Sequence, residues 1–107
     1  MKVYIAGKIT GNPNYKADFQ KARYFFSARQ GSYEVLDPSA LPDGMTPADY
    51  MQICFSMLFA ADAVAFLPNT HNSGGADLEY RLARYIGKEM IFLEDDPVFM
   101  DIWRYTT

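Results

Sequence analysis

Residues 63–86 constrain the fold of this chain more than any other segment. An apolar, strand-like run covers residues 63–67, and a helical pattern follows over residues 75–86. The turn Asn72-Ser73-Gly74-Gly75 between them is built from small residues, so its backbone amides can approach a ligand closely. Amides at the start of a helix favour an anion. Glu79 lies about one turn inside that helix, and we expect it beside whatever the turn binds.

The same alternation of strand and helix patterns runs through the rest of the chain. Strands are predicted at residues 3–6, 33–36, 63–67 and 90–93, and helices at residues 15–26, 47–61, 75–86 and 97–105. This order implies right-handed crossovers and a parallel sheet. We therefore predict an α/β fold in one domain over residues 1–107. Its form is a three-layer, doubly wound, Rossmann-like or flavodoxin-like parallel sheet of four to five strands, in the order 2-1-3-4.

The helix predicted at residues 47–61 is apolar on more than one face. Its start is well defined, because Thr46 can cap it and Pro47 occupies the first helical position. A helix that is apolar nearly all round is buried on two sides. Two interpretations remain open: a contact between subunits, or cover by the C-terminal tail.

Composition excludes several classes of protein. The chain has 107 residues, half of them apolar, and a formal net charge of -3. This charge argues against a protein that binds polymeric nucleic acid, although a single phosphate needs only a few local donors. Cys54 is the only cysteine, so neither an intramolecular disulfide nor a zinc cluster is expected, and we predict that it is buried. The first apolar run is too short for a signal peptide or a membrane span, which predicts a cytoplasmic protein without membrane contact.

Two glycine-bearing loops are predicted to meet at one edge of the sheet. In doubly wound sheets, ligands bind beyond the carboxyl ends of the strands. The loops at residues 7–13 and 69–75 follow two neighbouring strands, and Asp37 ends a third. Lys8, Thr10 and the amides of the first loop could hold a phosphate. The candidate substrate-binding residues are Gly7, Lys8, Ile9, Thr10, Gly11, Ser73, Gly74 and Gly75.

Two carboxylates are candidates for chemistry. Glu79 could be a nucleophile toward an anomeric carbon or a general base, or a solvent-facing glutamate paired with Arg81 or Arg84. Asp62 could supply the second carboxylate of a glycoside-cleaving pair. However, Asp62 precedes its strand, which places it at the opposite end of the sheet unless a short strand or a kink at the helix end brings it near the crevice. Asp77 is expected to stabilise the start of its helix through the helix dipole.

Three further side chains have alternative interpretations. Tyr4, in the first strand, could orient a carboxylate, contact a ligand or be a core tyrosine. Ser73 could donate to a ligand, cap its helix or do both. His71 stands alone in a polar loop, so no metal site is predicted.

Three segments of the chain resemble one known superfamily. Tyr4-Ile5-Ala6-Gly7-Lys8-Ile9-Thr10-Gly11, Ala61-Asp62-Ala63-Val64 and Ser73-Gly74-Gly75-Ala76-Asp77-Leu78-Glu79 are similar to segments of the nucleoside 2-deoxyribosyltransferase-like superfamily. The resemblance covers roughly residues 3–93. Within the superfamily, the chain resembles a small, often phage-associated branch that is related to the 2′-deoxynucleoside 5′-monophosphate N-glycosidases.

The resemblance implies a role for each matching residue. Glu79 corresponds to the nucleophile that attacks C1′ of the sugar, and Tyr4 to the tyrosine that orients it. Asp62 corresponds to an aspartate that contacts the sugar or assists the leaving base. Ser73 replaces an acidic residue of the transferases, which leaves room for a 5′-phosphate. The loop at residues 7–11 corresponds to the phosphate-binding loop. The resemblance also implies a homodimer or higher homo-oligomer.

The predicted function is cleavage of a base–sugar bond. We expect an N-glycosidase or a base-exchanging deoxyribosyltransferase that acts on a nucleoside 5′-monophosphate or a related nucleotide, with no metal or other cofactor. The partner is then a small nucleotide or nucleoside. One alternative is a non-catalytic module that sequesters or senses a nucleotide or nucleotide-derived signal. Another is cleavage of a ribosyl bond in an NAD-like dinucleotide.

Overall fold

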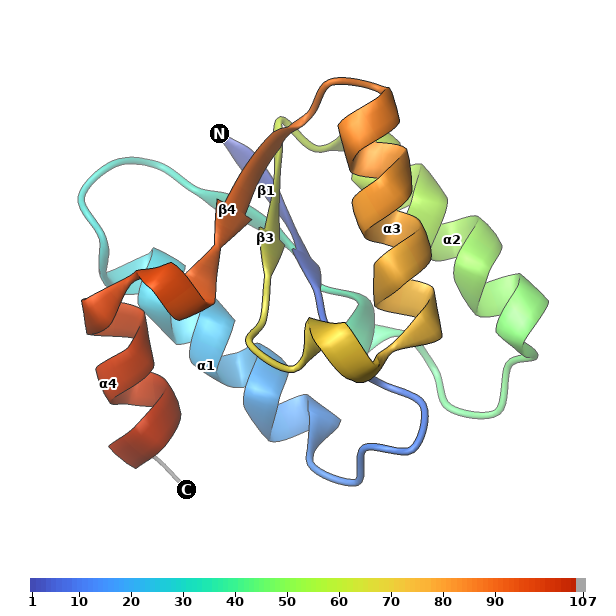
Figure 1. Ribbon diagram of the computed structural model, residues 1–107, viewed down its shortest axis with the longest axis horizontal. Coiled ribbons are helices and arrows are strands. Elements are labelled where there is room, and N and C mark those ends of the chain that lie inside the picture. Colours follow the sequence, from blue (N-terminus) through green and yellow to red (C-terminus); the bar gives the residue numbers. More distant parts are fainter. Residues whose placement is uncertain (106–107) are drawn as a thin grey trace.

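Strands and helices alternate along the chain in the computed structural model (Figure 1). The structure describes residues 1–105, apart from the side chain of residue 72. The strands are β1 (Lys2–Ala6), β2 (Glu34–Leu36), β3 (Ala63–Phe66) and β4 (Glu89–Phe92). The α-helices are α1 (Tyr15–Ala28), α2 (Pro47–Ala60), α3 (Gly74–Tyr85) and α4 (Pro97–Tyr105). Three short 3-10 helices connect them: η1 (Pro38–Ala40), η2 (Thr70–Asn72) and η3 (Leu93–Asp95).

The strands form one parallel sheet in the order β2-β1-β3-β4, which confirms the predicted topology. In the register of the two central strands, Val3 pairs with Ala63 and Ala6 with Phe66. No fifth strand occurs within residues 1–105, so the lower of the two predicted strand numbers is correct. The carboxyl ends of all strands therefore meet at one edge.

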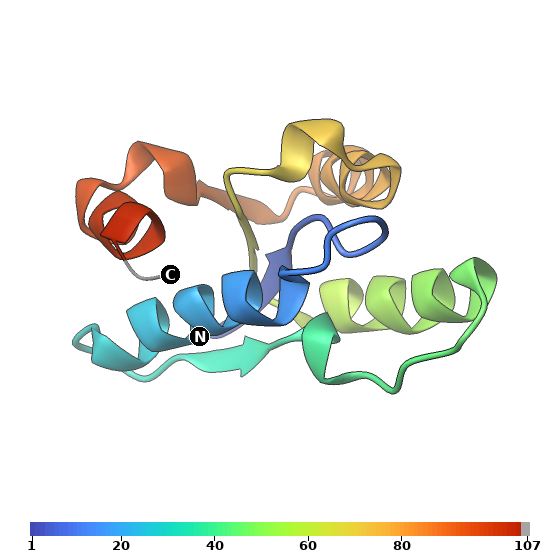
Figure 2. The ribbon, with the colours of Figure 1, turned by 90° about the horizontal axis from the view of Figure 1, so that it is seen from below.

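Helices cover both faces of the sheet, which gives the three predicted layers (Figure 2). Successive residues of a strand point to opposite faces. Val3 and Ile5 accordingly pack in the cluster that includes residues of α1 and α4. Tyr4 and Ala6 pack in the cluster that includes residues of α2 and α3. All four of these side chains are fully buried, as expected for a strand at the centre of a parallel sheet.

Hydroxyl side chains define the starts of α2 and α3. The side chain of Thr46 accepts a hydrogen bond of 3.2 Å from the Asp49 amide, and Pro47 occupies the first turn. The hydroxyl of Ser73 accepts one of 3.1 Å from the Ala76 amide. Each bond satisfies an amide that has no partner inside the helix. The predicted capping roles of both residues are thus confirmed.

The C-terminal helix α4 packs against α1 and not against α2. Phe99 is fully buried and meets Phe25 edge-to-face, with ring centroids 5.4 Å apart. The interpretation that the tail covers α2 is therefore wrong. Ile53 and Phe59 of α2 remain partly exposed, and the subunit contact stays a prediction. Within residues 1–105, no helix combines the length and apolar character needed to cross a membrane.

Candidate functional site

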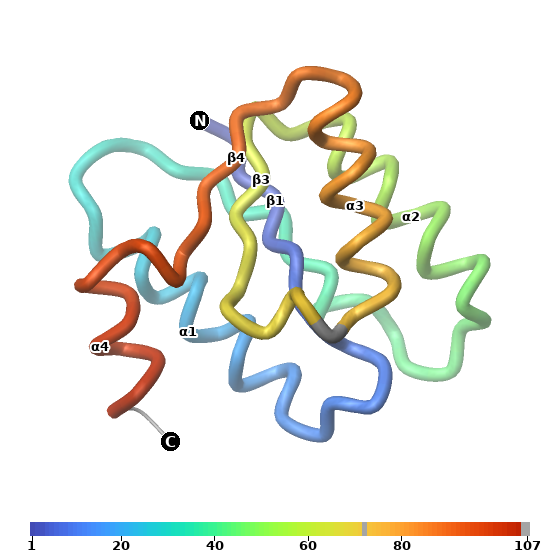
Figure 3. The backbone as a smooth tube through the Cα atoms, in the orientation of Figure 1, coloured from blue at the N-terminus to red at the C-terminus, as the bar shows by residue number. Residues whose placement is uncertain are grey.

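The loops after β1 and β3 lie at the same end of the sheet, close to the start of α3 (Figure 3). A cavity of about 480 Å³ opens there, between these loops and α2. Of the residues predicted to bind substrate, all but Gly11 line it: Gly7, Lys8, Ile9, Thr10, Ser73, Gly74 and Gly75. Glu79 lines it too. The structure thus brings together two loops that lie some sixty residues apart in the sequence.

The wall opposite the loops comes from α2 and was not predicted from the sequence. Pro47, Tyr50, Met51 and Cys54 line the cavity from this helix. They lie within two turns on one side of α2, which accounts for part of its second apolar face. That pattern was the signal that could have identified the wall. Cys54 is buried as predicted, with 6% of its surface exposed.

Glu79 is a buried carboxylate, so the alternative interpretation of a solvent-facing glutamate is wrong. Only 6% of its surface is exposed, and its Oε2 atom has no hydrogen-bond partner among the described residues. Burial raises the pKa of Glu79 to about 7, and the nearby Tyr4 hydroxyl partly opposes this rise. Arg81 does not pair with it, because the Nε atom of Arg81 lies 3.1 Å from Oδ2 of Asp77. Asp77 itself occupies the first turn of α3, as predicted.

Tyr4 places its hydroxyl beside this carboxylate and beside Cys54. The ring is fully buried in β1, and Oη makes no hydrogen bond of normal geometry within the described part of the chain. Burial, followed by the charge of Glu79, raises the pKa of Tyr4 well above its ordinary value of 10.0. The phenol therefore remains protonated and is available as a donor toward Glu79 or a ligand.

Gly7 and Gly11 of the first loop are needed for the structure of the loop itself. A Cβ atom on Gly7 would lie 2.5 Å from Cδ1 of Leu67 and 3.2 Å from Cε1 of Phe19. Gly11 has a φ of 76°, which L side chains rarely adopt. These positions shape the loop through packing and backbone conformation. Their glycines are therefore not in themselves a sign of phosphate binding.

A hydrogen-bond network centred on Asp18 joins the two loops, and no sequence pattern pointed to it. Oδ2 of Asp18 accepts from Nδ2 of Asn12 at 3.0 Å and from Nδ2 of Asn69 at 3.3 Å. Asn12 Nδ2 also donates to the Lys8 carbonyl at 3.0 Å. Oδ1 of Asn69 accepts from the Lys8 amide at 3.3 Å. One carboxylate in the first turn of α1 thus holds both loops that line the cavity.

Asp62 lies outside the candidate site, which corrects its predicted catalytic role. It precedes β3, at the amino end of the sheet, where its Oδ2 atom accepts a hydrogen bond of 2.8 Å from the Lys2 amide. This bond lowers the pKa of the exposed Asp62 carboxyl. Asp37 does not line the cavity either. Its carboxylate accepts from the Ser39 amide at 2.8 Å and lies 2.9 Å from Nε of Arg23.

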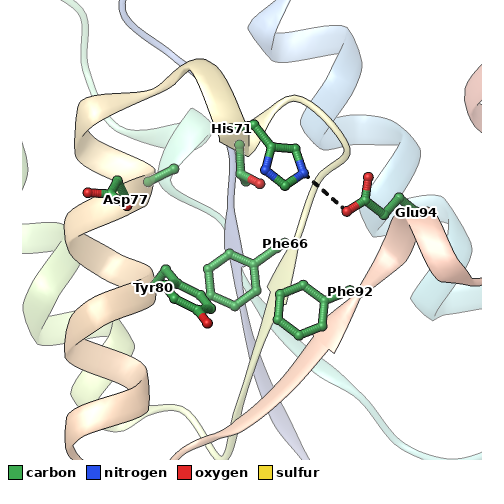
Figure 4. A pocket seen from close by; sticks show the side chains of 8 residues that line it. Phe66, His71, Asp77, Tyr80, Phe92 and Glu94 are labelled. Carbon is green, nitrogen blue, oxygen red and sulfur yellow. Dashed lines mark hydrogen bonds and ion pairs between the residues drawn. The ribbon is translucent and has the colours of Figure 1, made fainter.

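A second cavity of about 420 Å³ lies along α3 and is floored by aromatic rings (Figure 4). Its lining includes Phe66, His71, Asp77, Tyr80, Phe92 and Glu94. Nε2 of His71 lies 3.2 Å from Oε1 of Glu94. Within residues 1–105, no group of three His, Cys, Asp or Glu side chains could hold a metal ion. This cavity was not predicted from the sequence, because its rings come from two strands and a helix that lie apart in the chain.

Comparisons with known proteins agree with the topology of the fold. The chain has the fold of a 2-desoxiribosyltransferase from Leishmania mexicana, with a TM-score of 0.66 and 20% sequence identity over 85% of this chain. This chain spans 62% of the length of that protein. No curated protein sequence matches. The model of the DUF4406 family, described as a domain of unknown function, matches residues 1–92. The chain therefore belongs to the DUF4406 family, and its fold is nucleoside 2-deoxyribosyltransferase-like.

Proposed function

We propose that the protein cleaves the base–sugar bond of a nucleoside 5′-monophosphate, as an N-glycosidase or as a base-exchanging deoxyribosyltransferase. The observation that carries this proposal is Glu79, a buried carboxylate with an unpartnered oxygen that lines a cavity between two loops. Burying a carboxylate without partners is unfavourable. A buried carboxylate with an unpartnered oxygen is suited to act as a nucleophile toward an electron-poor carbon.

The phosphate end of the substrate is assigned to the start of α3 and the first loop. The first amides of α3, at Gly74 and Gly75, have no acceptor inside the helix and point toward its positive end. Lys8 lines the same cavity and pairs with no carboxylate among the described residues. Ser73 adds a hydroxyl at the position where an acid would repel phosphate. These groups favour a monophosphate over a free nucleoside.

The proposed reaction has two steps. An oxygen of the Glu79 carboxylate attacks C1′, the bond from C1′ to the base nitrogen breaks, and the base leaves with that electron pair. Water supplies the proton that the base takes up, because no second carboxylate lines the cavity within the described residues. In the second step, water attacks C1′ and displaces the Glu79 carboxylate, and its proton neutralises the hydroxide left by the first step. In a transferase, a ring nitrogen of a second base attacks instead and gives up its proton in the same way. The Tyr4 hydroxyl orients the carboxylate during both steps.

The experiment measures the release of free base from each deoxynucleoside and ribonucleoside 5′-monophosphate by chromatography. We expect release from at least one of them, and its loss in Glu79→Gln with nucleotide binding retained. Intact-protein mass spectrometry should detect a pentose-phosphate adduct on the wild type and none on the variant. Adding a different free base to the reaction separates the two forms of the activity, because only a transferase makes a new nucleotide. Base release by Glu79→Gln at the wild-type rate would remove the proposal.

A second candidate function is binding of a nucleotide without turnover. The observation that favours it is the position of Asp62 at the far end of the sheet, which leaves the cavity without a second carboxylate. A sequestering module needs only the loops, Lys8 and the start of α3. Tight binding of a nucleotide to the wild type, with no free base after prolonged incubation, would favour this function over cleavage.

A further inference from the structure

The second cavity presents three aromatic rings side by side from three different elements (Figure 4). Phe66 and Phe92 are stacked, with ring centroids 5.4 Å apart and planes 18° from parallel. Tyr80 of α3 stands 5.8 Å from Phe66 and 6.3 Å from Phe92. Phe66 is buried, whereas Phe92 is 38% exposed. The floor of this cavity is thus a broad aromatic surface with an accessible edge, of the kind on which flat rings stack.

Polar side chains also line this cavity. The His71 and Glu94 side chains pair above the rings (Figure 4), and Asp77 of α3 is also among the lining residues. These groups offer hydrogen-bond donors and acceptors to the edge of a ring. An apolar floor with a few polar groups is the usual composition of a site for a small molecule. The volume of about 420 Å³ lies within the ordinary range for such sites.

The charges around the cavity disfavour a phosphate. Two of its lining side chains are acidic, Glu94 and Asp77. The neighbouring donors are already engaged, since Nε2 of His71 lies 3.2 Å from Oε1 of Glu94 and the Arg81 guanidinium pairs with Asp77. The first cavity differs, because Lys8 lines it without a carboxylate partner among the described residues. A ligand of the second cavity should therefore be flat, aromatic and uncharged.

We propose that the second cavity binds a free nucleobase. The ring lies on Phe92 and Tyr80, and its polar edge meets His71 and Glu94. The choice of a nucleobase among flat heteroaromatic rings rests on the proposed function, since cleavage of a nucleotide releases one. The two cavities lie on neighbouring sides of α3, since Ala76 lines both, Glu79 lines only the first and Tyr80 only the second. A base bound at the second site would therefore contact the helix that carries Glu79 without occupying the first site.

The test is a calorimetric titration with adenine and, separately, with thymine. The proteins are the wild type, Glu79→Gln, Phe92→Ser and His71→Ala, with Ile53→Ser as a matched loss of an exposed apolar side chain on α2. We expect at least one base to bind the wild type, Glu79→Gln and Ile53→Ser equally. Phe92→Ser should weaken its binding about tenfold or more, because each stacked ring contributes strongly to base binding. His71→Ala should weaken it by a smaller factor.

Two outcomes would overturn the inference. In one, neither base binds the wild type at millimolar concentrations. In the other, binding is lost in Glu79→Gln and kept in Phe92→Ser, which would place the base in the first cavity. If Phe92→Ser does not fold, His71→Ala carries the test, because the His71 side chain is 72% exposed. The titrations measure binding and not catalysis. Absence of base binding therefore does not contradict the proposed cleavage, and absence of cleavage does not contradict the base-binding site.

Discussion

Glu79 and Asp62 lie at opposite ends of the sheet, and their carboxylates differ in burial, in hydrogen bonding and in the direction of the pKa shift. At the carboxyl end, Glu79 is buried, lines a cavity and has a pKa raised to about 7. At the amino end, Asp62 is exposed, accepts a hydrogen bond from the Lys2 amide and has a lowered pKa. The first acid is held in an environment that opposes its charge. The second is held in one that favours its charge.

The environments of these two carboxylates have opposite effects on the stability of the charged form. A hydrogen bond from the Lys2 amide stabilises the charged form of Asp62. Burial destabilises the charged form of Glu79, and a rise from 4.5 to about 7 corresponds to roughly 3 kcal/mol. Unfavourable ionisation of this size is common at functional sites. Under the proposed function, the chemistry is therefore expected at the carboxyl end of the sheet.

The largest expected effect is the loss of base release in Glu79→Gln. We expect a fall of about 10³-fold or more in kcat, because removal of a nucleophile abolishes the covalent step. The matched variant Asp62→Asn removes the other carboxylate and should leave kcat almost unchanged. Both are measured as free base released from the best nucleotide substrate at saturation.

An equal loss in both variants would break this comparison. It would mean that Asp62 reaches a substrate after all, for instance that of a neighbouring subunit. A circular-dichroism spectrum and a thermal midpoint for each variant serve as the control for folding. A lower kcat of Asp62→Asn is evidence for a catalytic role only if that variant is folded at the assay temperature.

The sequence predicted the fold well because each element carries its own local signal. The apolar runs gave the strands, Thr46 and Ser73 marked two helix starts, and the alternation gave the topology. The predicted tail helix at residues 97–105 is also confirmed. These features depend on neighbours in the sequence, and such patterns can be read without a structure.

The site was predicted only in part, because much of it depends on contacts between distant residues. Asp18 meets Asn69 across 51 positions of the chain, and no local spacing encodes that contact. The prediction for Asp62 failed for a related reason. Its order along the chain matched a family motif, whereas its place before β3 puts it at the wrong end of the sheet. The position of Asp62 relative to its strand predicted its location better than the motif did.

The second prediction concerns stability as a function of pH. The pKa of Glu79 is raised in the folded state, so the folded protein holds this proton more tightly than the unfolded chain. Stability is then full below the unfolded value of 4.5 and falls as the pH rises through about 7. Urea unfolding between pH 5 and pH 8 should show a loss of about 2–3 kcal/mol from this group.

Glu79→Gln sharpens this prediction, because glutamine has no proton to lose. The variant should not show this loss between pH 5 and pH 8, and should be more stable than the wild type at pH 8. Base release by the wild type should change in the opposite sense and rise with pH through about 7, since the nucleophile must be ionised. Parallel stability curves for the two proteins would contradict the assigned environment.

The third prediction tests whether Asp18 positions the two loops of the site. Asp18→Ala removes the acceptor shared by Asn12 and Asn69. Each of these bonds is worth about 1 kcal/mol, so we expect KM to rise about tenfold with a smaller change in kcat. The measurement is the dependence of base release on nucleotide concentration.

Asp18→Asn is the matched control, because it keeps an acceptor oxygen and loses only the charge. It should restore most of the affinity for nucleotide. Asp18 also lies in the first turn of α1, where its charge favours the helix dipole. If Asp18 acts only through the helix dipole, Asp18→Ala and Asp18→Asn should lose equal stability and keep the KM of the wild type. That result would exclude a positioning role for Asp18.

The smallest expected effect is on the stability contributed by Asp62, and its pH dependence should be opposite to that of Glu79. Asp62→Ala removes the acceptor of the Lys2 amide at the start of β1, so the thermal midpoint at pH 7 should fall by a few degrees. The folded pKa of Asp62 is lowered, so its contribution is present above the unfolded value of 3.8 and disappears as the pH falls through the folded value. The midpoints of wild type and variant should therefore converge in acid. Convergence of the midpoints at alkaline pH instead would show that Asp62 and Glu79 do not have opposite pH dependences of stability.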